Sequence, residues 1–390
     1  MDFDELLHRG VAEVIVEAEL RQRLAEGKPL RLKQGFDPTR PEMHIGHAVG
    51  LRKLRQFQEL GHQVVLIVGD WTAQIGDPSG RDETRTRLSA EEVRANAEIF
   101  MEQFFRVVDR QRTEVRWQSE WFGTFRLEQA LDLAGRFTLA QMLAHETFRK
   151  RYESGAGLTI LELMYPMLQG YDSVAIKADV EFGGTDQKFN ILAGRELMAQ
   201  LGMTPQQVFL VPLIPGTDGR KMSKTFLNTV DIRSAPSEMF GRVMSMTDGV
   251  IPLYFEVFTD VPLDELAEIH RALAEGSVNP RDLKLRIARE VVAQFHSPDE
   301  ARAAEEAFVR QFVQRELPAD IPEHQLAAPT AIVDLMVAAG LAASKSEARR
   351  LIDGGGVRID GARVERYDLA LHPGAGAVVQ VGRRKFVRVV

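Results

Sequence analysis

The chain has 390 residues, of which 44% are hydrophobic, and it contains no cysteine. Its length allows two or three domains with packed cores, and the lack of cysteine excludes disulfides, thiolate metal sites and a cysteine nucleophile. The acidic N-terminus argues against a signal peptide, and no apolar run reaches the roughly 18 residues of a membrane span. We therefore expect a cytoplasmic protein with no membrane partner.

The net charge of −7 is unevenly distributed along the chain. From Ala331 onward ten basic residues outnumber six acidic ones, so this segment carries +4 and residues 1–330 carry −11. A basic segment on an acidic body predicts a local surface for anions, with nucleic acid as the expected ligand.

The first 230 or so residues alternate short β-branched runs with helical patterns, which predicts an α/β fold with a mostly parallel sheet. Strands are expected at residues 30–36, 64–68 and 208–211, and the second is a continuous apolar run typical of a strand buried on both faces. Between them, residues 91–167 are mainly helical. The apolar positions of this stretch fit either a core or a subunit interface.

The remainder of the chain divides into a helical part and a small mixed part. Residues 236–316 have helical spacing, and residues 317–329 contain three prolines and predict a linker. Residues 330–390 predict a separate unit, in which a helix at 346–352 stops at three glycines. A strand at 357–359 then enters an Asp-Gly hairpin turn.

The first candidate site follows the first predicted strand, where a helix begins near His44. A helix N-terminus is a natural phosphate site. His44 and His47 share a helical face and can each donate a hydrogen bond to a triphosphate, and Gly46 would let a flat ring approach the backbone. Two histidines near a helix start are more often incidental, and without a third ligand no metal site is predicted.

The second candidate site is the loop after the last predicted strand of the sheet. Lys221 and Lys224 are three residues apart and flank Met222 and Ser223 on a segment with nearby glycines. Such a loop can close over phosphates and open again. A solvated basic loop is the alternative.

Three more groups of polar residues lie near predicted strand ends or on one helix face. Asp77, Arg81 and Arg85 follow the second strand, where ligands bind in such sheets, although the intervening Pro-Ser-Gly also fits a plain turn. A helix would align the next group on one face, where its members either satisfy one another or bind a polar ligand. The residues of this second group are Tyr165, Gln169 and Asp172. The third group consists of Gly184, Asp186 and Gln187 at a strand-to-helix turn, where Asp186 is placed to accept a hydrogen bond from a ribose hydroxyl.

The order and spacing of these motifs carry a specific resemblance. His-Ile-Gly-His at 44–47 and Lys-Met-Ser-Lys at 221–224 resemble the paired signatures of the class I aminoacyl-tRNA synthetases. Together with the sequences at 35–39, 76–80 and 168–172, they make the chain similar to the tyrosyl-tRNA synthetases over nearly its whole length.

The resemblance implies a domain plan. A Rossmann-like catalytic domain spans 1–235, with a helical insertion at about 91–167 that joins two subunits. An α-helical anticodon-side domain spans 236–316. After the linker at 317–329, residues 330–390 resemble an RNA-binding domain of the small-subunit ribosomal protein type.

The resemblance also implies an activity, in which L-tyrosine reacts with ATP to give tyrosyl-adenylate and pyrophosphate and is then transferred to the 3′ end of tRNA(Tyr). The implied assembly is a homodimer, with Mg²⁺ arriving on ATP and no tightly bound cofactor. By the same resemblance, Asp172 accepts from the phenol, Asp77, Tyr165 and Gln169 hold the ammonium group, Gln187 lies at the carboxylate and Asp186 binds the ribose. The residues implied to surround the triphosphate are Thr39, His44, His47, Arg81, Arg85, Lys221 and Lys224. The rest of the implied ATP site comprises Gly46, Gly184, Met222 and Ser223. The residues implied to face RNA are Lys345, Arg349, Arg350 and Arg358.

Two departures from the family pattern and two alternatives remain. Many members have a tyrosine that makes a second bond to the phenol where this chain has Lys33, and Thr225 replaces the usual serine. A tryptophanyl-tRNA synthetase shares the fold, but the basic C-terminal unit weighs against it. A non-catalytic RNA-binding paralogue is the other alternative, against which the intact histidines and lysines of the two signatures argue.

Overall fold

The computed structural model describes residues 3–77, 88–223, 226–312, 321–382 and 385–390. The chain divides into two compact units, Met1–Glu305 and Glu306–Val390. Because residues 3–77, 88–223 and 226–305 fall in one unit, the boundary at 235/236 stays a prediction. None of the described helices is long and apolar enough to cross a membrane.

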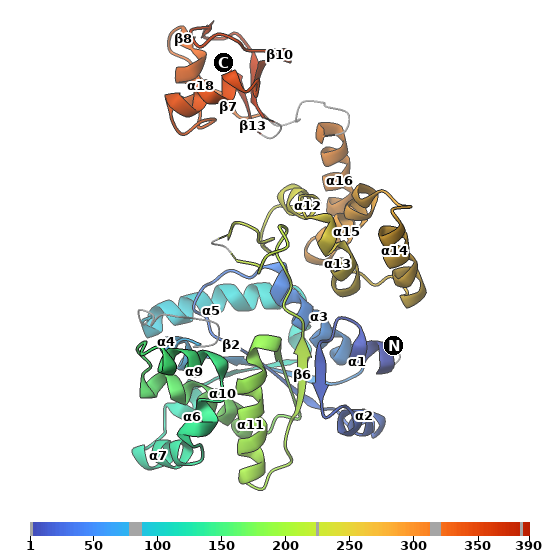
Figure 1. Cartoon of the computed structure of the whole chain (residues 1–390), viewed down its shortest axis with the longest axis vertical. Helices are drawn as coiled ribbons and strands as arrows, with labels where there is room; N and C mark the ends of the chain where they lie inside the picture. Colours follow the sequence, from blue (N-terminus) through green and yellow to red (C-terminus); the bar gives the residue numbers. More distant parts are fainter. Residues whose placement is uncertain (1–2, 78–87, 224–225, 313–320, 383–384) are drawn as a thin grey trace. The chain divides into compact units, whose positions relative to one another are not determined.

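The first unit is built on a six-stranded sheet with the strand order β1-β6-β5-β2-β3-β4 (Figure 1). All neighbouring strands are parallel except β1, which runs antiparallel to β6. The strands are β1 (Glu13–Ile15), β2 (Arg31–Phe36), β3 (Gln63–Val68), β4 (Thr113–Trp117), β5 (Val180–Gly184) and β6 (Gln207–Val211). The mostly parallel α/β sheet predicted from the sequence is therefore confirmed, including the strands at 30–36, 64–68 and 208–211.

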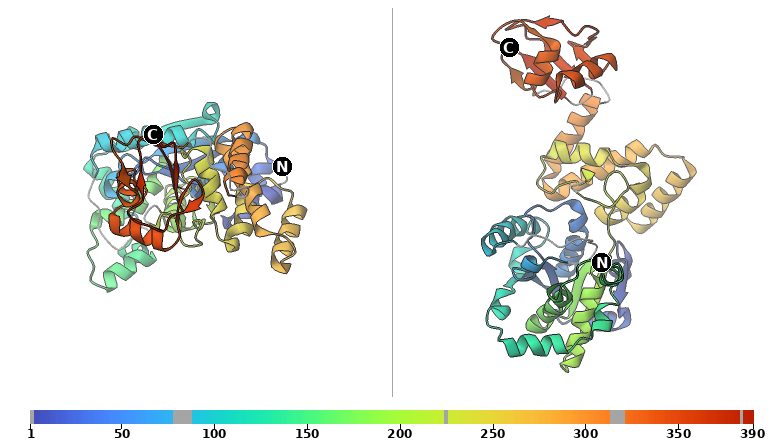
Figure 2. Two further views of the ribbon diagram at one scale, coloured as in Figure 1. Left: turned by 90° about the horizontal axis from the view of Figure 1, so that it is seen from above. Right: turned by 60° about the vertical axis from the view of Figure 1, so that its left-hand side comes forward.

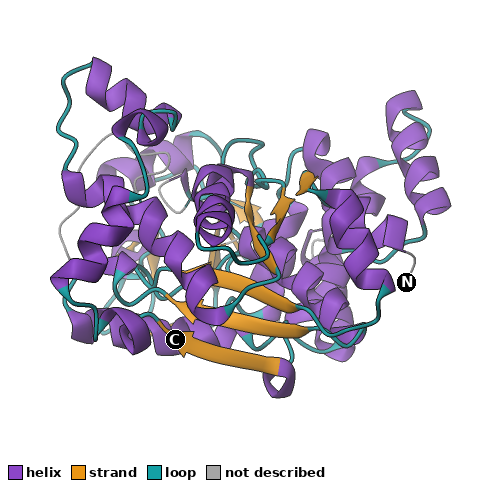
Figure 3. Ribbon diagram, turned by 90° about the horizontal axis from the view of Figure 1, so that it is seen from below, coloured by secondary structure: helices purple, strands orange, loops and turns teal. Residues whose placement is uncertain are grey.

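Helices cover both faces of this sheet (Figure 3), which explains why β3 and β6 are apolar along almost their whole length. Before β4 the helices are α1 (Phe3–His8), α2 (Glu17–Ala25), α3 (Ile45–Glu59), α4 (Thr72–Ile75) and α5 (Ala90–Phe104), followed by the short η1 (Arg110–Arg112). After β4 come α6 (Ser119–Phe122), α7 (Leu127–Gly135), α8 (Leu139–Met142), α9 (Glu146–Glu153), α10 (Ile160–Ile176), η2 (Thr185–Gln187) and α11 (Lys188–Gln200).

The stretch at 91–167 differs from the predicted helical insertion in two ways. It contains β4, the edge strand of the main sheet, and it ends inside α10, whose C-terminal half lies beyond the predicted boundary. All five residues of β4 are only half-buried, so the strand lacks the apolar run that revealed β3. Only α6 to α9 lie wholly between β4 and α10.

The sheet creates a crevice where its strand order reverses. From β2 the chain continues to β3 and β4 on one side, whereas β5 and β6 lie on the other. In such sheets ligands bind beyond the carboxyl ends of the strands at this point. Residues that follow β2, β3, β5 and β6 therefore meet at one place.

Helices α10 and α11 approach each other closely at two glycines. A Cβ atom added to Gly170 would lie 3.0 Å from the Cα atom of Gly194, and one added to Gly194 would lie 3.2 Å from the Cα atom of Gly170. Since backbone atoms cannot give way as a flexible side chain can, this contact fixes the position of α10 on α11.

We expect Gly170→Ala to lower the free energy of unfolding by about 1–3 kcal/mol, because the added methyl group overpacks the contact. Chemical denaturation of the wild-type protein and the variant measures this loss. Gly241→Ala is the matched control, since Gly241 lies within α12 with open space around its Cβ position. That variant should be neutral or slightly stabilised, and equal losses in both variants would contradict the role of the contact.

The helical part of the first unit begins after the loop that follows β6 (yellow to orange in Figure 2). The predicted helices at 236–312 are confirmed in the described chain, and apolar side chains such as Phe240, Tyr254 and Phe255 are fully buried among them. The elements are α12 (Pro236–Met244), η4 (Asp248–Val250), α13 (Ile251–Phe258), α14 (Leu263–Glu275), α15 (Pro280–Phe295) and α16 (Pro298–Phe312), the last of which continues into the second unit.

The second unit packs two helices against small sheets around its own apolar core. The predicted helix, strand and hairpin turn are confirmed, with Asp360 and Gly361 both at positive φ. Residues 323–326, expected within the linker, instead belong to this unit, because β7 pairs with β13 and Leu326 packs on the core. Its elements are β7 (Glu323–His324), β8 (Thr330–Ala331), α17 (Ile332–Ala338), α18 (Lys345–Asp353), β9 (Val357–Ile359), β10 (Ala362–Arg363), β11 (Ala370–Leu371), β12 (Val378–Val381) and β13 (Lys385–Val389).

Candidate active site

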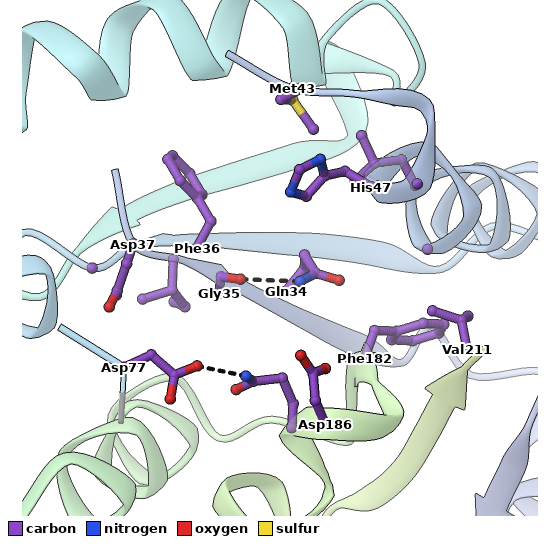
Figure 4. Close-up of a pocket in the computed structure, with 18 of the residues that line it drawn as sticks. Gln34, Gly35, Phe36, Asp37, Met43, His47, Asp77, Phe182, Asp186 and Val211 are labelled. Atoms are coloured by element: carbon purple, nitrogen blue, oxygen red, sulfur yellow. Dashed lines mark hydrogen bonds between the residues drawn. The ribbon is translucent and has the colours of Figure 1, made fainter. Parts of the chain in front are cut away.

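A cavity of about 470 Å³ lies at the strand-order reversal (Figure 4). It joins segments that are far apart in the sequence, from the end of β2 to the loop after β6. Thirteen of the predicted site residues line it: Thr39, His44, Gly46, His47, Asp77, Tyr165, Gln169, Asp172, Gly184, Asp186, Gln187, Lys221 and Met222.

Four of the residues predicted for tyrosine and ATP are not placed in this cavity. Ser223 is described but does not line the cavity. Arg81, Arg85 and Lys224 lie outside the described residues, as does Thr225. Their expected roles at the triphosphate therefore stay predictions.

The N-terminus of α3 holds the two histidines of the first signature. His44 is the N-cap residue, and the Nδ1 atom of His47 lies 3.2 Å from the backbone nitrogen of His44. The same Nδ1 atom lies 3.2 Å from the carbonyl oxygen of His44, so either tautomer of the neutral ring forms one of these two bonds. The tautomer in which Nδ1 accepts carries its proton on Nε2 and would present the hydrogen-bond donor that an anion site at a helix N-terminus requires.

The two signatures touch each other. A Cβ atom on Gly46 would lie 3.0 Å from the Nδ1 atom of His44 and 3.3 Å from the sulfur of Met222. Backbone contacts reinforce this, because His44 forms a β-bridge with Asp231 and the N–H of Ile45 donates to the carbonyl of Val230 at 2.9 Å. Residues almost 180 positions apart thus form one wall of the cavity.

The opposite wall is one face of α10. Burial raises the pKa of Tyr165 well above its usual value, and nearby Asp37 and Asp77 add to the effect. The hydroxyl therefore stays protonated and donates to Oδ2 of Asp37 at 2.9 Å. The predicted alignment of Tyr165, Gln169 and Asp172 on one helix face is confirmed, since all three line the cavity.

Asp172 lies at the buried end of the cavity and is only 2% exposed. Its Oδ2 atom accepts from Nε2 of Gln118 at 2.8 Å, and its Oδ1 atom accepts from the indole N–H of Trp121 at 3.2 Å. Burial raises the pKa of Asp172 to about 7, with Glu181 acting in the same direction and Lys33, Gln118 and Trp121 opposing it. A carboxylate has about four acceptor sites, so two bonds leave room for a ligand donor.

Gln118 is held in one orientation by its neighbours. Its Oε1 atom accepts from the backbone N–H of Thr72 at 3.0 Å and lies 2.9 Å from the hydroxyl of Thr72. The amide nitrogen must therefore face Asp172. This bond spans 54 residues of sequence, from the end of β4 to α10.

Acidic side chains from two further loops complete the cavity (Figure 4). Asp77 accepts from the amide of Gln187 at 2.7 Å. Burial raises the pKa of Asp186, Asp77 adds to the effect, and Lys221 opposes it. Because Asp77, Asp186 and Lys221 all line the cavity, groups of both charge signs are available to a ligand that has cationic and anionic parts.

Sequence reasoning missed several residues that shape this site. Asp37 belongs to the Gly-Phe-Asp-Pro-Thr sequence, which was a usable signal, but only the structure pairs it with Tyr165 and with Thr72, whose hydroxyl donates to Asp37 at 2.6 Å. Gln118 directly follows β4, and its place at a strand end would have been a signal had that strand been recognised. Trp121 offered no signal in the sequence.

The predicted RNA-facing residues all lie in the second unit. Lys345, Arg349, Arg350 and Arg358 are exposed. The first three lie on α18, and Arg358 lies on β9. Lys345 forms an exposed ion pair with Asp334, and Arg358 donates to the carbonyl of Gly361, so an anionic partner would compete with these contacts at the protein surface.

No group of three or more His, Cys, Asp or Glu side chains that could hold a metal occurs among the described residues.

Comparison with known proteins gives one consistent family. Residues 25–313 match the family described as tRNA synthetases class I (W and Y), and residues 313–389 match the tyrosine–tRNA ligase SYY-like C-terminal domain. A tyrosine–tRNA ligase of Dehalococcoides mccartyi is 52% identical over 390 residues, covering 99% of this chain and 98% of that protein. A tyrosine–tRNA ligase of Thermotoga maritima is 46% identical over 386 residues, with 99% and 96% covered.

Solved structures support the fold. A tyrosyl-tRNA synthetase from Archaeoglobus fulgidus, complexed with L-tyrosine, superimposes with a TM-score of 0.61 at 22% identity, covering 77% of this chain and 98% of that one. A truncated mitochondrial tyrosyl-tRNA synthetase from Aspergillus nidulans gives a TM-score of 0.65 at 22% identity, covering 79% of this chain and 93% of that one.

Proposed function

The chain belongs to the class I tRNA synthetases of the tryptophan and tyrosine group and, within them, to the tyrosine–tRNA ligases, and on that premise we propose how its residues divide the work. The α10 wall binds tyrosine, and the wall formed by the two signatures binds ATP. The supporting observation is that one cavity of about 470 Å³ brings both walls together.

In the tyrosine half, Asp172 accepts a hydrogen bond from the phenol. Asp77, Tyr165 and Gln169 surround the ammonium group, and the carboxylate lies near Gln187. The buried position of Asp172 supports this arrangement, because a buried acceptor left unpaired by phenylalanine costs free energy. Tyrosyl-tRNA synthetases are themselves the established example of hydroxyl selection without editing, so the size of that effect is not a new inference.

In the ATP half, Asp186 binds the ribose, and Gly46, Gly184, Met222 and Ser223 form the rest of the nucleotide site. Thr39, His44, His47 and Lys221 surround the phosphates, together with Arg81, Arg85 and Lys224. Mg²⁺ enters as part of the ATP complex, held by phosphate oxygens, with no tightly bound cofactor.

The first reaction joins a tyrosine carboxylate oxygen to the α-phosphorus of ATP and releases pyrophosphate. The carboxylate is ionised at neutral pH, so the protein needs no general base. It aligns the two substrates and stabilises the negative charge that builds on the leaving phosphates. Histidine and lysine donors are suited to that task.

In the second reaction, tyrosine passes to the 3′ end of tRNA(Tyr). We propose that Lys345, Arg349, Arg350 and Arg358 contact the phosphate backbone of this tRNA. Their exposure and the +4 charge of residues 331–390 support the assignment. We also propose a cytoplasmic location, where translation consumes the product.

Amino-acid-dependent exchange of labelled pyrophosphate into ATP tests the proposed function. Tyrosine, tryptophan and phenylalanine are supplied separately, without tRNA. We expect exchange with tyrosine alone. Exchange with tryptophan would identify the chain as a tryptophanyl-tRNA synthetase, and no exchange with any of the three amino acids would contradict the catalytic assignment.

We further propose that two chains form a homodimer through the apolar surface of the insertion, defined by Leu127, Leu131, Leu139 and Ile160. These side chains are 55–75% exposed. Leu127 and Leu131 are one turn apart on α7 and so share a face of that helix, and exposed apolar faces are typical of interaction sites.

We expect Leu131→Asp to weaken the dimer about 30-fold or more, because it places a charge in a desolvated interface. Sedimentation velocity across a concentration series measures the change. Leu263→Asp is the matched control, since Leu263 is 52% exposed on α14, outside the insertion. A wild-type protein that remains monomeric at high concentration would overturn the proposal.

A further inference from the structure

The side chain of Lys33 has no place in the reaction described above, yet it lies beneath the tyrosine site. It projects from β2, in the middle of the sheet, and is 0% exposed. Its Nζ atom donates to the carbonyl of Gln169 at 2.7 Å and to the hydroxyl of Ser173 at 2.8 Å, and lies 3.0 Å from Oε1 of Glu181. All three ammonium protons therefore have acceptors.

Glu181 is equally enclosed, at 1% exposure. Its Oε1 atom also accepts from the side-chain amide of Gln169 at 3.2 Å, and its Oε2 atom accepts from Ser173 at 3.1 Å and from Gln206 at 2.5 Å. Gln169, which lines the cavity, is thus held by hydrogen bonds at two points: Lys33 binds its backbone carbonyl and Glu181 binds its side-chain amide.

The charges at this end of the cavity do not balance. The buried carboxyl groups of Asp172 and Glu181 share one buried cation, Lys33, and the two charges act on Asp172 in opposite directions, with Lys33 the larger. The other described ionisable groups around the cavity, Asp37, Asp77, Tyr165 and Asp186, are acidic, apart from Lys221 and the two histidines at the ATP wall. Without Lys33, no other described cation buried near Asp172 would offset its negative charge.

We propose that Lys33 is a positioning and specificity-determining residue: it holds Gln169 in place, and its positive charge favours the ionised form of Asp172, the form that accepts the phenol hydroxyl most strongly. This inference rests on the proposed function of the cavity. A tyrosine at this position would contact the substrate directly. Lys33 does not contact it and instead acts on Gln169 through hydrogen bonds and on Asp172 through its positive charge.

A purely structural ion pair would have a different signature. Replacing both partners of a buried pair with neutral groups is often tolerated, whereas removing one partner leaves a buried charge unpaired. A structural defect would lower the use of tyrosine and phenylalanine alike. A charge acting on Asp172 would alter the ratio between them and make that ratio depend on pH.

The test measures kcat/KM for tyrosine and for phenylalanine in pyrophosphate exchange, from pH 5.5 to 9, in the wild type and in Lys33→Met. The ratio of the two values cancels the ionisation of ATP and of the α-ammonium group, which both amino acids share. The pH dependence of this ratio therefore reports ionisation of a group in the free enzyme that affects the two amino acids differently. In the wild type, selectivity for tyrosine should fall as pH drops through about 7, where Asp172 becomes protonated.

In Lys33→Met, we expect the midpoint of this selectivity curve to move up by about one pH unit or more, because a nearby cation lowers a carboxyl pKa by that amount. At pH 7 the selectivity ratio should fall about fivefold or more and recover as the pH is raised. Lys33→Arg, which keeps the charge, should retain the wild-type midpoint if it folds.

If Lys33→Met does not fold, the double variant Lys33→Met/Glu181→Gln replaces it, since that variant contains no unpaired buried charge at the pair. Its midpoint should also move up, because Lys33 outweighs Glu181 in its effect on Asp172. An unchanged midpoint and ratio in the folded variant would overturn the inference, as would an equal loss with both amino acids at every pH. Absence of tyrosine-dependent exchange in the wild type would instead refute the proposed function.

Discussion

Asp172→Ala is expected to lower the preference for tyrosine over phenylalanine by about a hundredfold or more. The variant loses a charge-assisted hydrogen bond to the phenol, so kcat/KM for tyrosine should fall roughly a hundredfold. For phenylalanine kcat/KM should stay the same or rise, because its ring no longer faces a buried carboxylate that it cannot pair. The two effects together collapse the selectivity ratio.

Pyrophosphate exchange with each amino acid measures this ratio. Asp264→Ala is the control, since Asp264 is an exposed carboxylate in the first turn of α14. That variant should keep the wild-type selectivity. If Asp172→Ala still prefers tyrosine as strongly as the wild type does, Asp172 does not accept a hydrogen bond from the phenol hydroxyl.

Lys221→Ala is expected to slow the formation of tyrosyl-adenylate by a hundredfold or more while leaving the affinity for tyrosine nearly unchanged. Loss of one donor that stabilises charge in a transition state costs roughly 3–4 kcal/mol in comparable electrostatic sites. Lys221 lines the cavity and acts electrostatically on Asp186, and it is not among the charges that act on Asp172. Its removal should thus affect the rate and not the binding of the amino acid.

Single-turnover formation of the adenylate separates these two quantities, because the rate at saturating tyrosine and the tyrosine concentration dependence are measured together. Lys28→Ala serves as the control, since Lys28 is 80% exposed and precedes β2, at the opposite end of the strand from the cavity. A normal rate in Lys221→Ala would remove this lysine from the phosphate site. The same loss is expected of Lys224→Ala by resemblance, although Lys224 lies outside the described residues.

Polar side chains in this cavity both form hydrogen bonds within the protein and line the proposed ligand site, two roles that are usually treated as alternatives. Tyr165, Gln169 and Asp172 satisfy their polar groups with Asp37, Glu181 and Gln118, and they line the site as well. Internal bonding and ligand binding therefore do not compete here. The internal bonds hold each side chain in place before the substrate arrives, which limits the ordering cost of binding.

Local features of the protein could be predicted from its amino-acid sequence alone. The apolar run of β3, the Asp-Gly turn at 360–361 and the periodicity of the helices at 236–312 depend on neighbouring residues, so they could be predicted from short windows. The two signature motifs were also visible, because each occupies a few consecutive residues. Their resemblance to paired signatures implied a common site, and residues of both motifs line one cavity.

Features that depend on residues far apart in the sequence became visible only in the folded chain. The half-buried edge strand β4 gave no clear pattern, and with it Gln118 and Trp121 were missed as partners of Asp172. Lys33 appeared in the sequence only as a departure from a family pattern. Its meaning depends on Glu181, nearly 150 residues away, because a buried charge can be understood only together with the groups that neutralise it.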